Sequence, residues 1–173
     1  IVSGTTVASN NTTIAVTFSE AVFDTNGGSG ALEVSDFALS ISGGVATVNA
    51  TPSSISISGN VYTLGLNLSG TPDGAETLTV VPSGSTAIYD ATGNAASTTQ
   101  SNNTISLNDQ AAPIVSGTTI ASNNTTIAVT FNEAVFNTDG GSGALQASDF
   151  ALSISGGVAT VNATPSSISI SGN

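Results

Sequence analysis

Carboxylates are almost the only side chains in this chain that could carry out chemistry. The 173 residues include eleven Asp and Glu and no Lys, Arg, His or Cys, which gives a formal net charge of −11. Without an imidazole, thiol, amine or guanidinium, most acid-base, nucleophilic and phosphate-transfer chemistry is excluded. Two functions of carboxylates are left to consider: binding of a hard cation, and hydrolysis of a glycosidic bond by a carboxylate pair.

Composition argues against an enzyme. Sugar-cleaving sites need aromatic platforms, but the chain has two Tyr, six Phe and no Trp, and the residue pattern assigns Phe18 and Phe37 to core faces. We therefore expect no enzymatic activity. The absence of basic residues also excludes nucleic acid as a partner. No run of about 20 apolar residues occurs, so we expect no membrane insertion.

The elements that must position the carboxylates are predicted to be mostly β-strands. Alternating apolar residues predict seven strands, at residues 3–8, 12–19, 36–43, 45–58 with an interruption at Pro52, 61–68, 76–82 and 102–107. Gly59-Asn60 predicts a two-residue hairpin turn between the fourth and fifth strands. Helical periodicity is limited to one turn near residues 32–36. The pattern predicts an all-β fold, an immunoglobulin-like Greek-key β-sandwich of about seven strands that is tandemly repeated.

The chain repeats itself at a spacing of 113 residues. Ile1–Asn60 and Ile114–Asn173 align without a gap, and only six positions differ: Val7/Ile120, Ser19/Asn132, Asp24/Asn137, Asn26/Asp139, Glu33/Gln146 and Val34/Ala147. So long a period indicates tandem domains rather than a solenoid, whose units run about 20 to 50 residues.

We predict a complete module at residues 1–113 with a C-terminal linker at 107–113, and the first four strands of a second module at 114–173. Such a half cannot bury its core and exposes bare strand edges. We therefore expect either a stretch of a longer array or completion by another chain.

Strand direction predicts where the carboxylates gather. If consecutive strands alternate in direction, the linker leaves one end of a module and enters the opposite end of the next. Asp109 would then face Glu133 and Asp139, with Asp73 close by. Converging carboxylates without a basic partner repel one another, and a bound calcium ion relieves that repulsion. These four residues are candidate calcium ligands; the alternative is solvated surface charge that maintains solubility.

Four segments carry a family resemblance. In order they are TIAVTFSEAV from residue 13, SDFALSISGG from 35, ETLTVV from 76 and IYDATGN from 88. Together they resemble the bacterial Ig-like domains of S-layer and large surface proteins, over the whole module. The resemblance implies a secreted, tandemly arrayed spacer or adhesive domain, located outside the cell or on its surface. It implies no catalytic residues.

Acceptor sequences for glycan, Asn-x-Ser/Thr, are frequent in the chain. Asn49, Asn67 and Asn162 are the candidate attachment sites. Because the chain is rich in Asn, Ser and Thr, many such sequences arise by chance. Glycan attachment and a bare surface therefore both stay open.

Two functions follow from these observations. The first is a structural repeat unit of an extracellular filament, stalk or surface layer, which assembles with itself end to end through linker junctions or by strand complementation between subunits. The alternative is an adhesin module that binds a glycan or a protein through the loop between the second and third strands (residues 24–35) and the loop before the seventh strand.

Overall fold

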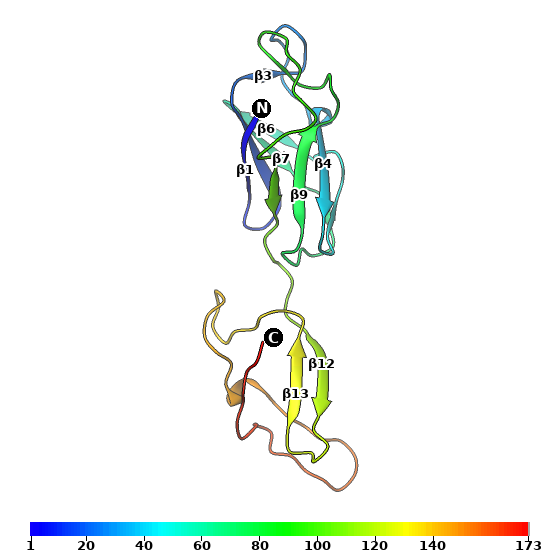
Figure 1. The fold of residues 1–173 in the computed structure, drawn as a ribbon, viewed down its shortest axis with the longest axis vertical. Coiled ribbons are helices and arrows are strands. Elements are labelled where there is room, and N and C mark those ends of the chain that lie inside the picture. The colour runs from blue at the N-terminus through cyan, green and yellow to red at the C-terminus, as the bar shows by residue number, and fades with distance from the viewer. Residues whose placement is uncertain (173) are drawn as a thin grey trace. The chain divides into compact units, whose positions relative to one another are not determined.

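A computed structural model, which describes residues 1–172, shows an all-β chain (Figure 1). The chain divides into two compact units, unit 1 (Ile1–Ala111) and unit 2 (Ala112–Asn173). Within the described residues the helical elements are two single 3-10 turns, η1 (Val34–Asp36) and η2 (Ala147–Asp149). Over the same residues, no helix has the length and apolar character needed to span a membrane.

The larger sheet of unit 1 has four antiparallel strands in the order β1-β2-β7-β6. They are β1 (Val2–Val7), β2 (Thr13–Phe18), β6 (Ile55–Ser58) and β7 (Val61–Gly65). Alternate residues of β2 are buried because successive side chains of a strand point to opposite faces. One face of this sheet is therefore apolar and the other faces solvent.

A second sheet lies across the core from the first, with the order β11-β9-β4 (Figure 1). Its strands are β4 (Phe37–Ser42), β9 (Thr77–Pro82) and β11 (Thr104–Ser106). Two pairs of two-residue strands complete unit 1: β3 (Val22–Phe23) with β10 (Tyr89–Asp90), and β5 (Thr47–Val48) with β8 (Leu68–Ser69).

The core of unit 1 lies between the two sheets and gives it a sandwich-like architecture. Ile14 and Leu64 of the first sheet and Leu78 of the second are all 0% exposed. The rings of Phe18 and Tyr62 meet edge to face with centroids 5.4 Å apart, a preferred aromatic geometry. These contacts join segments far apart in sequence, since β7 pairs with β2 and β9 pairs with β4.

The first strand and the last segment of unit 1 run side by side in the same direction. The Val2 amide donates to Gln100 Oε1 at 2.9 Å, and Thr5 Oγ1 donates to the Thr104 carbonyl at 3.3 Å. These bonds hold β1 beside residues 100–104 through side-chain contacts rather than through a regular strand ladder.

Unit 2 repeats the first hairpin of unit 1. β12 (Val115–Ile120) pairs with β13 (Ile127–Phe131) in the register of β1 with β2, including the irregularity after the first strand residue. None of the described residues of unit 2 is buried. Ile127 is 41% exposed, whereas its counterpart Ile14 is 0% exposed.

The structure confirms the all-β prediction and contains strands in each of the seven predicted regions of unit 1. The fourth predicted strand, 45–58, forms two strands, β5 and β6, which join different sheets. Pro52 lies between them and lacks the backbone donor that a ladder needs. The short strands β3 and β10 were not expected, because two residues are too few to show alternation.

The repeat provides a matched test of the core. We expect Ile14→Ala to lower the free energy of unfolding of unit 1 by about 2–5 kcal/mol, because it leaves a cavity between the sheets. The same change at Ile127 should cost less than about 1 kcal/mol, because that side chain is already exposed. Urea unfolding of the two variants measures the difference; equal losses would contradict this assignment of the core.

Candidate functional site

Hydrogen bonds of two asparagine side chains fix the end of unit 1 that leads into the linker. Asn11 is 2% exposed and has φ +56, a left-handed conformation that Asn tolerates. Its Nδ2 donates to the Asn108 carbonyl at 2.7 Å, and the Asn108 amide donates to Asn11 Oδ1 at 2.9 Å. The Asn108 side chain also donates to the Ala8 carbonyl at 3.1 Å. The turn after β1 is thus tied to the residue that begins the linker.

The hydrogen bonds continue along the linker. The Gln110 amide donates to the Pro72 carbonyl at 2.9 Å, and its side chain reaches the Ser9 carbonyl at 3.3 Å. The Ala111 amide donates to Asp109 Oδ1 at 2.9 Å. Residues 108–111 are therefore part of unit 1 rather than a free tether, and we call this region, with residues 8–12 and 66–76, the linker end.

A buried carboxylate supports the same end. Glu76 is 0% exposed; its Oε1 accepts from the Val45 and Ala46 amides, both at 2.9 Å, and its Oε2 accepts from the Asp73 amide at 3.1 Å. Burial alone would raise the pKa of Glu76, but the hydrogen bonds from these backbone amides outweigh it and hold the pKa below its ordinary value. Backbone dipoles thus take the place of a basic partner.

A neighbouring glycine makes room for this carboxylate. Gly44 has φ +57, and a Cβ atom there would overlap the Glu76 carboxyl group. The loop 43–46 therefore closes around Glu76 because its sequence begins with two glycines.

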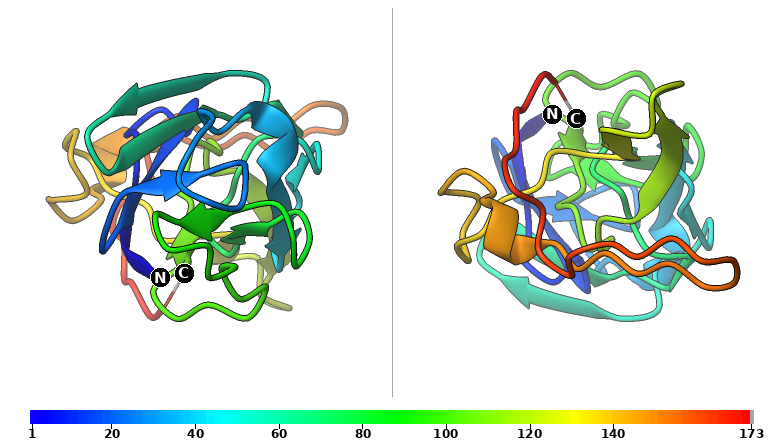
Figure 2. Two further views of the ribbon diagram at one scale, coloured as in Figure 1. Left: turned by 90° about the horizontal axis from the view of Figure 1, so that it is seen from above. Right: turned by 90° about the horizontal axis from the view of Figure 1, so that it is seen from below.

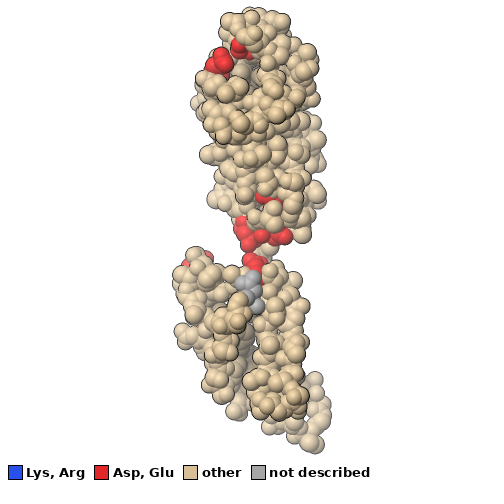
Figure 3. Space-filling view, in the orientation of Figure 1, with Lys and Arg blue, Asp and Glu red and all other residues tan. Residues whose placement is uncertain are grey.

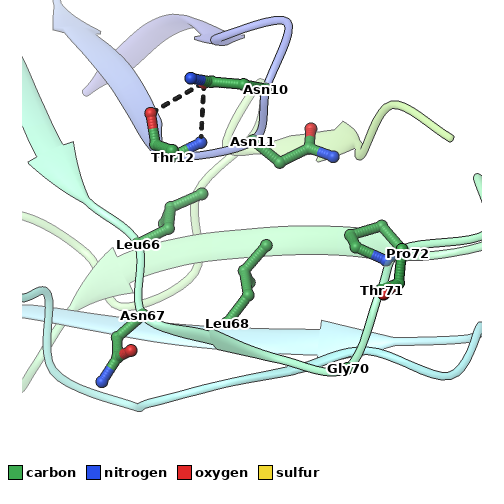
Figure 4. A pocket seen from close by; sticks show the side chains of 9 residues that line it. All are labelled: Asn10, Asn11, Thr12, Leu66, Asn67, Leu68, Gly70, Thr71 and Pro72. Carbon is green, nitrogen blue, oxygen red and sulfur yellow. Dashed lines mark hydrogen bonds between the residues drawn. The ribbon is translucent and has the colours of Figure 1, made fainter. Parts of the chain in front are cut away.

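An open groove with a volume of about 350 Å³ lies at the linker end (Figure 4). Its lining residues are Asn10, Asn11, Thr12, Leu66, Asn67, Leu68, Gly70, Thr71 and Pro72. The Asn10 side chain already accepts from the Thr12 amide and hydroxyl, and that of Asn11 is bonded to Asn108. The lining carries neither a charged side chain nor an aromatic ring, so the groove offers only a few neutral polar contacts to a ligand.

Two of the four predicted calcium ligands, Asp73 and Asp109, lie on neighbouring segments of unit 1. A Cβ atom at Gly74 would be 3.3 Å from the Asp109 Cβ, which places the Asp73 loop beside Asp109. Both carboxylates also accept from nearby backbone amides, Asp73 from Ala75 and Asp109 from Ala111. These bonds fit the turn role that Asp often has. In the face drawn in Figure 3, acidic atoms gather toward both ends of unit 1.

The other two predicted ligands, Glu133 and Asp139, belong to unit 2. Glu133 is half-buried, with its Oε1 3.4 Å from the Asn132 side-chain amide, and Asp139 is exposed. Across residues 1–172, no group of three or more Asp, Glu, His or Cys side chains is placed to hold a metal ion. The four-residue calcium site at the junction stays a prediction.

The three candidate glycan sites, Asn49, Asn67 and Asn162, are all exposed. Asn49 and Asn67 are neighbours, since the Asn49 amide donates to the Asn67 carbonyl at 3.1 Å. Their exposure leaves them accessible to modification, and their glycosylation stays a prediction. Asn11 also precedes Thr-Thr, but its side chain is buried and hydrogen bonded and is unsuitable for a glycan.

The opposite end of unit 1 brings together the loops after β2 and β9, which lie side by side in Figures 1 and 2. A Cβ atom at Gly28 would approach the Ala91 carbonyl oxygen to 3.0 Å, so the two loops touch. Asp90 accepts from Asn94 and Thr92, and these hydrogen bonds hold its pKa well below the ordinary range. Asp24 Oδ1 is buried without a hydrogen-bond partner among the described residues.

Sequence reasoning missed the roles of Glu76, Asn11 and Asn108. Glu76 appeared as the first residue of a strand, and Asn11 as one of many glycan acceptor sequences. Their partners lie 30 and 97 residues away in sequence, so no local pattern reveals the contact. The one available signal was a carboxylate directly before an apolar strand in a chain without basic residues.

The amide-bound carboxylate predicts acid sensitivity. Because its folded pKa lies below the unfolded value of about 4.3, Glu76 contributes stability above about pH 4.3, and this contribution is lost as the pH falls. We expect Glu76→Gln to destabilise unit 1 at neutral pH, with the difference from wild type shrinking as the pH falls through the folded pKa of Glu76. Urea unfolding across pH measures this, with Asp73→Asn as the exposed control; a difference independent of pH would contradict the assignment.

Comparison with known proteins gave no relative for this arrangement. No protein-family model, curated protein or solved structure matches the chain. Its function is therefore inferred from its own residues and their geometry.

Proposed function

We propose that this chain is a structural repeat unit of an extracellular filament, stalk or surface layer, built from tandem immunoglobulin-like domains that assemble end to end. The sheet orders support the domain type. With the seven main strands lettered A to G, the orders β1-β2-β7-β6 and β11-β9-β4 read A-B-E-D and G-F-C, the arrangement of a Greek-key immunoglobulin sandwich. The resemblance of the sequence to surface-protein domains supports the location.

The observation that carries the proposal is the bonding of the linker into unit 1. A flexible spacer is solvated and free to rotate, but here residues 108–111 bond to the turn after β1 and to the segment before β9. Because hydrogen bonds fix the direction of residues 108–111, the strands of unit 1 set the direction in which the chain continues. A force that acts on the following residue is likewise transmitted to those strands. That property suits a stalk or filament and has no use in a loosely tethered binding domain.

The chemistry of the surface is consistent with a structural role. The chain has no basic residue, and its carboxylates gather toward the ends of unit 1 in the view of Figure 3. A net charge of one sign keeps copies of a repeat from associating sideways without order. Because the carboxylates lie toward the ends, an end-to-end contact depends on the covalent linker or on a bound cation such as the predicted calcium ion.

One observation favours the alternative, an adhesin module. The loops around Asp24 and Asp90 meet at one end of unit 1, and Asp24 Oδ1 is buried there without a hydrogen-bond partner among the described residues. Paired loops on a rigid sandwich are a common place for a binding site.

The linker bonds can be tested with the repeat as its own control. Asn11→Ala removes the bonds to Asn108 and places Ala at a left-handed φ, whereas Asn124→Ala carries the same backbone penalty at φ +59 on an exposed residue. We expect Asn11→Ala to destabilise the chain by about 1–3 kcal/mol more than Asn124→Ala. Thermal unfolding of both variants measures the difference; similar losses would show that the linker bonds contribute nothing.

Imaging tests the proposed role directly. We expect negative-stain electron micrographs of protein purified from its native source to show filaments, stalks or ordered layers with a repeating subunit. Micrographs that show only separate particles would contradict the structural proposal. Binding to a glycan array that disappears when residues 24–30 are replaced by a short glycine linker would favour the adhesin instead.

A further inference from the structure

The larger sheet of unit 1 has an open edge at β6. In the order β1-β2-β7-β6, β6 pairs with β7 on one side, and no described residue pairs with its other side. The other outer strands of the two main sheets are covered. β1 and β11 lie beside each other, joined by the bond from Thr5 Oγ1 to the Thr104 carbonyl. Beside β4, the Ala50 carbonyl accepts from the Leu39 amide at 2.7 Å. An uncovered edge offers its backbone donors and acceptors to another strand.

The free backbone groups of this edge belong to Ile55 and Ile57. The Ser54 carbonyl accepts from the Gly65 amide at 2.9 Å, so Ser54 bonds toward β7. Successive residues of an antiparallel strand bond alternately to one side and to the other. The serines of β6 therefore bond to β7, whereas Ile55 and Ile57 direct their amide and carbonyl groups outward. The Ile57 side chain is also 46% exposed, so a second strand can reach this edge.

The sequence of the edge is a palindrome. Residues 54–58 read Ser-Ile-Ser-Ile-Ser in both directions. Two copies that pair antiparallel about a two-fold axis at Ser56 place Ile55 of each copy opposite Ile57 of the other. In this register the outward amide and carbonyl groups of both Ile pairs bond to each other. Ile meets Ile on the face of buried Tyr62 and Leu64, and Ser meets Ser on the opposite face. A symmetric contact requires this self-complementarity.

The flank that carries β6 is the uncharged part of unit 1. Every carboxylate of unit 1 lies outside residues 37–72, the segment that forms β4 to β8. In the face drawn in Figure 3, acidic atoms lie toward the two ends of unit 1 and not between them. Two negatively charged copies repel each other where their carboxylates face, and the repulsion is weakest where none is present. Edge strands commonly carry a charge that prevents pairing, but β6 has none.

From these features we propose that β6 is a self-association edge, at which residues 54–58 of two copies of this chain pair antiparallel and join their larger sheets. The occupant is the same strand of a second copy, because the palindrome and the lack of charge both fit that partner. The inference goes beyond the end-to-end assembly proposed above, since it names a sideways contact between repeats. Pairing of two identical edges uses up both edges, so it joins modules two by two and does not continue without limit.

The contact is small, and repetition of the sequence would strengthen it. Five residues from each copy bury little area, so two single modules should associate weakly. The same five residues recur at 167–171, so the repeat carries the palindrome at the spacing of 113 residues. Several weak contacts between the same two chains give an avidity far above that of one contact. Such an edge would join arrays of repeats while single modules stay mostly separate.

Disulfide trapping tests the register, because the chain contains no Cys. Ser56 is exposed and lies on the proposed axis. It would face its own copy in a non-hydrogen-bonded pair with Cα atoms about 4.5 Å apart, a separation that a disulfide can span. We expect the full chain with Ser56→Cys to form a disulfide-linked dimer under mild oxidation. Trapping also detects a weak contact, because each encounter in this register can be captured.

Ser58→Cys is the matched control. Ser58 is exposed on the same face of the same strand, but in the palindromic register it lies opposite Ser54 of the other copy. The Ser58→Cys chain should therefore form dimers about tenfold more slowly than the Ser56→Cys chain. A mixture of Ser54→Cys and Ser58→Cys chains should form mixed dimers rapidly, because these two positions face each other.

A change at the edge itself should prevent trapping. Ile57→Pro removes an outward amide and leaves the bonds of β6 to β7 in place. Added to the Ser56→Cys chain, it should abolish the dimer without a large change in the thermal unfolding midpoint. Ile57→Glu is the second variant if proline disturbs folding, because it keeps the backbone amide and adds like charges to the contact. Ser40→Glu places the same charge on an exposed residue of β4 and should leave trapping unchanged.

Four results would overturn the inference: no dimer with Ser56→Cys, equal rates for Ser56→Cys and Ser58→Cys, a linked species whose mass differs from that of two chains, or trapping that survives both Ile57 variants. The outcome is separable from that of the proposed function. Ordered filaments in micrographs without trapping would overturn this inference and leave the structural role standing. Register-specific trapping together with micrographs that show only separate particles would support the self-association edge and contradict the structural role.

Discussion

The packing of residues 1–60 against residues 61–111 is the interaction on which every other part of unit 1 depends. β7 and β9 pair with strands from the first segment and bring Tyr62, Leu64 and Leu78 against its apolar face. In unit 1, where residues 61–111 are present, they cover the apolar face of residues 1–60 and the core side chains are fully buried. In unit 2, nearly the same 60 residues keep their first hairpin and the ring pair of Phe131 and Phe150, but none of the described residues is buried. Local geometry in this sequence thus forms without the core, and the core requires both segments.

A second constraint is the absence of any basic side chain. A buried carboxylate ordinarily needs a cationic partner or several hydrogen-bond donors. Glu76 is satisfied by three backbone amides, and the linker is held by neutral amide groups of Asn11, Asn108 and Gln110. Such bonds depend less on salt than ion pairs do, because screening acts on charge. The joints of unit 1 should therefore be insensitive to ionic strength.

Much of the fold could be predicted from the sequence. Period-two alternation located the strands, since Ile14, Val16 and Phe18 fall on one buried face, and Gly59-Asn60 marked a hairpin turn. Pro52 marked the interruption of the fourth strand but not that its halves join different sheets, which depends on pairing with β7 and β8. The linker end could not be predicted, because the contacts of Glu76 and Asn108 join residues distant in sequence. Strand direction predicts that the candidate calcium ligands Asp73 and Asp109 lie near each other, and the structure places Gly74, the residue after Asp73, beside Asp109; calcium binding stays a prediction.

The parallel course of β1 and residues 100–108 has a mechanical consequence. Hydrogen bonds join Val2 to Gln100, Thr5 to Thr104 and Asn11 to Asn108 along one line. A pull on Ile1 in one direction and on Ala111 in the other loads all of these bonds together in shear, rather than opening them one after another like a zipper. These side-chain bonds between two short segments thus resist tension jointly. Under such a pull the two segments would separate only when the whole line of hydrogen bonds breaks.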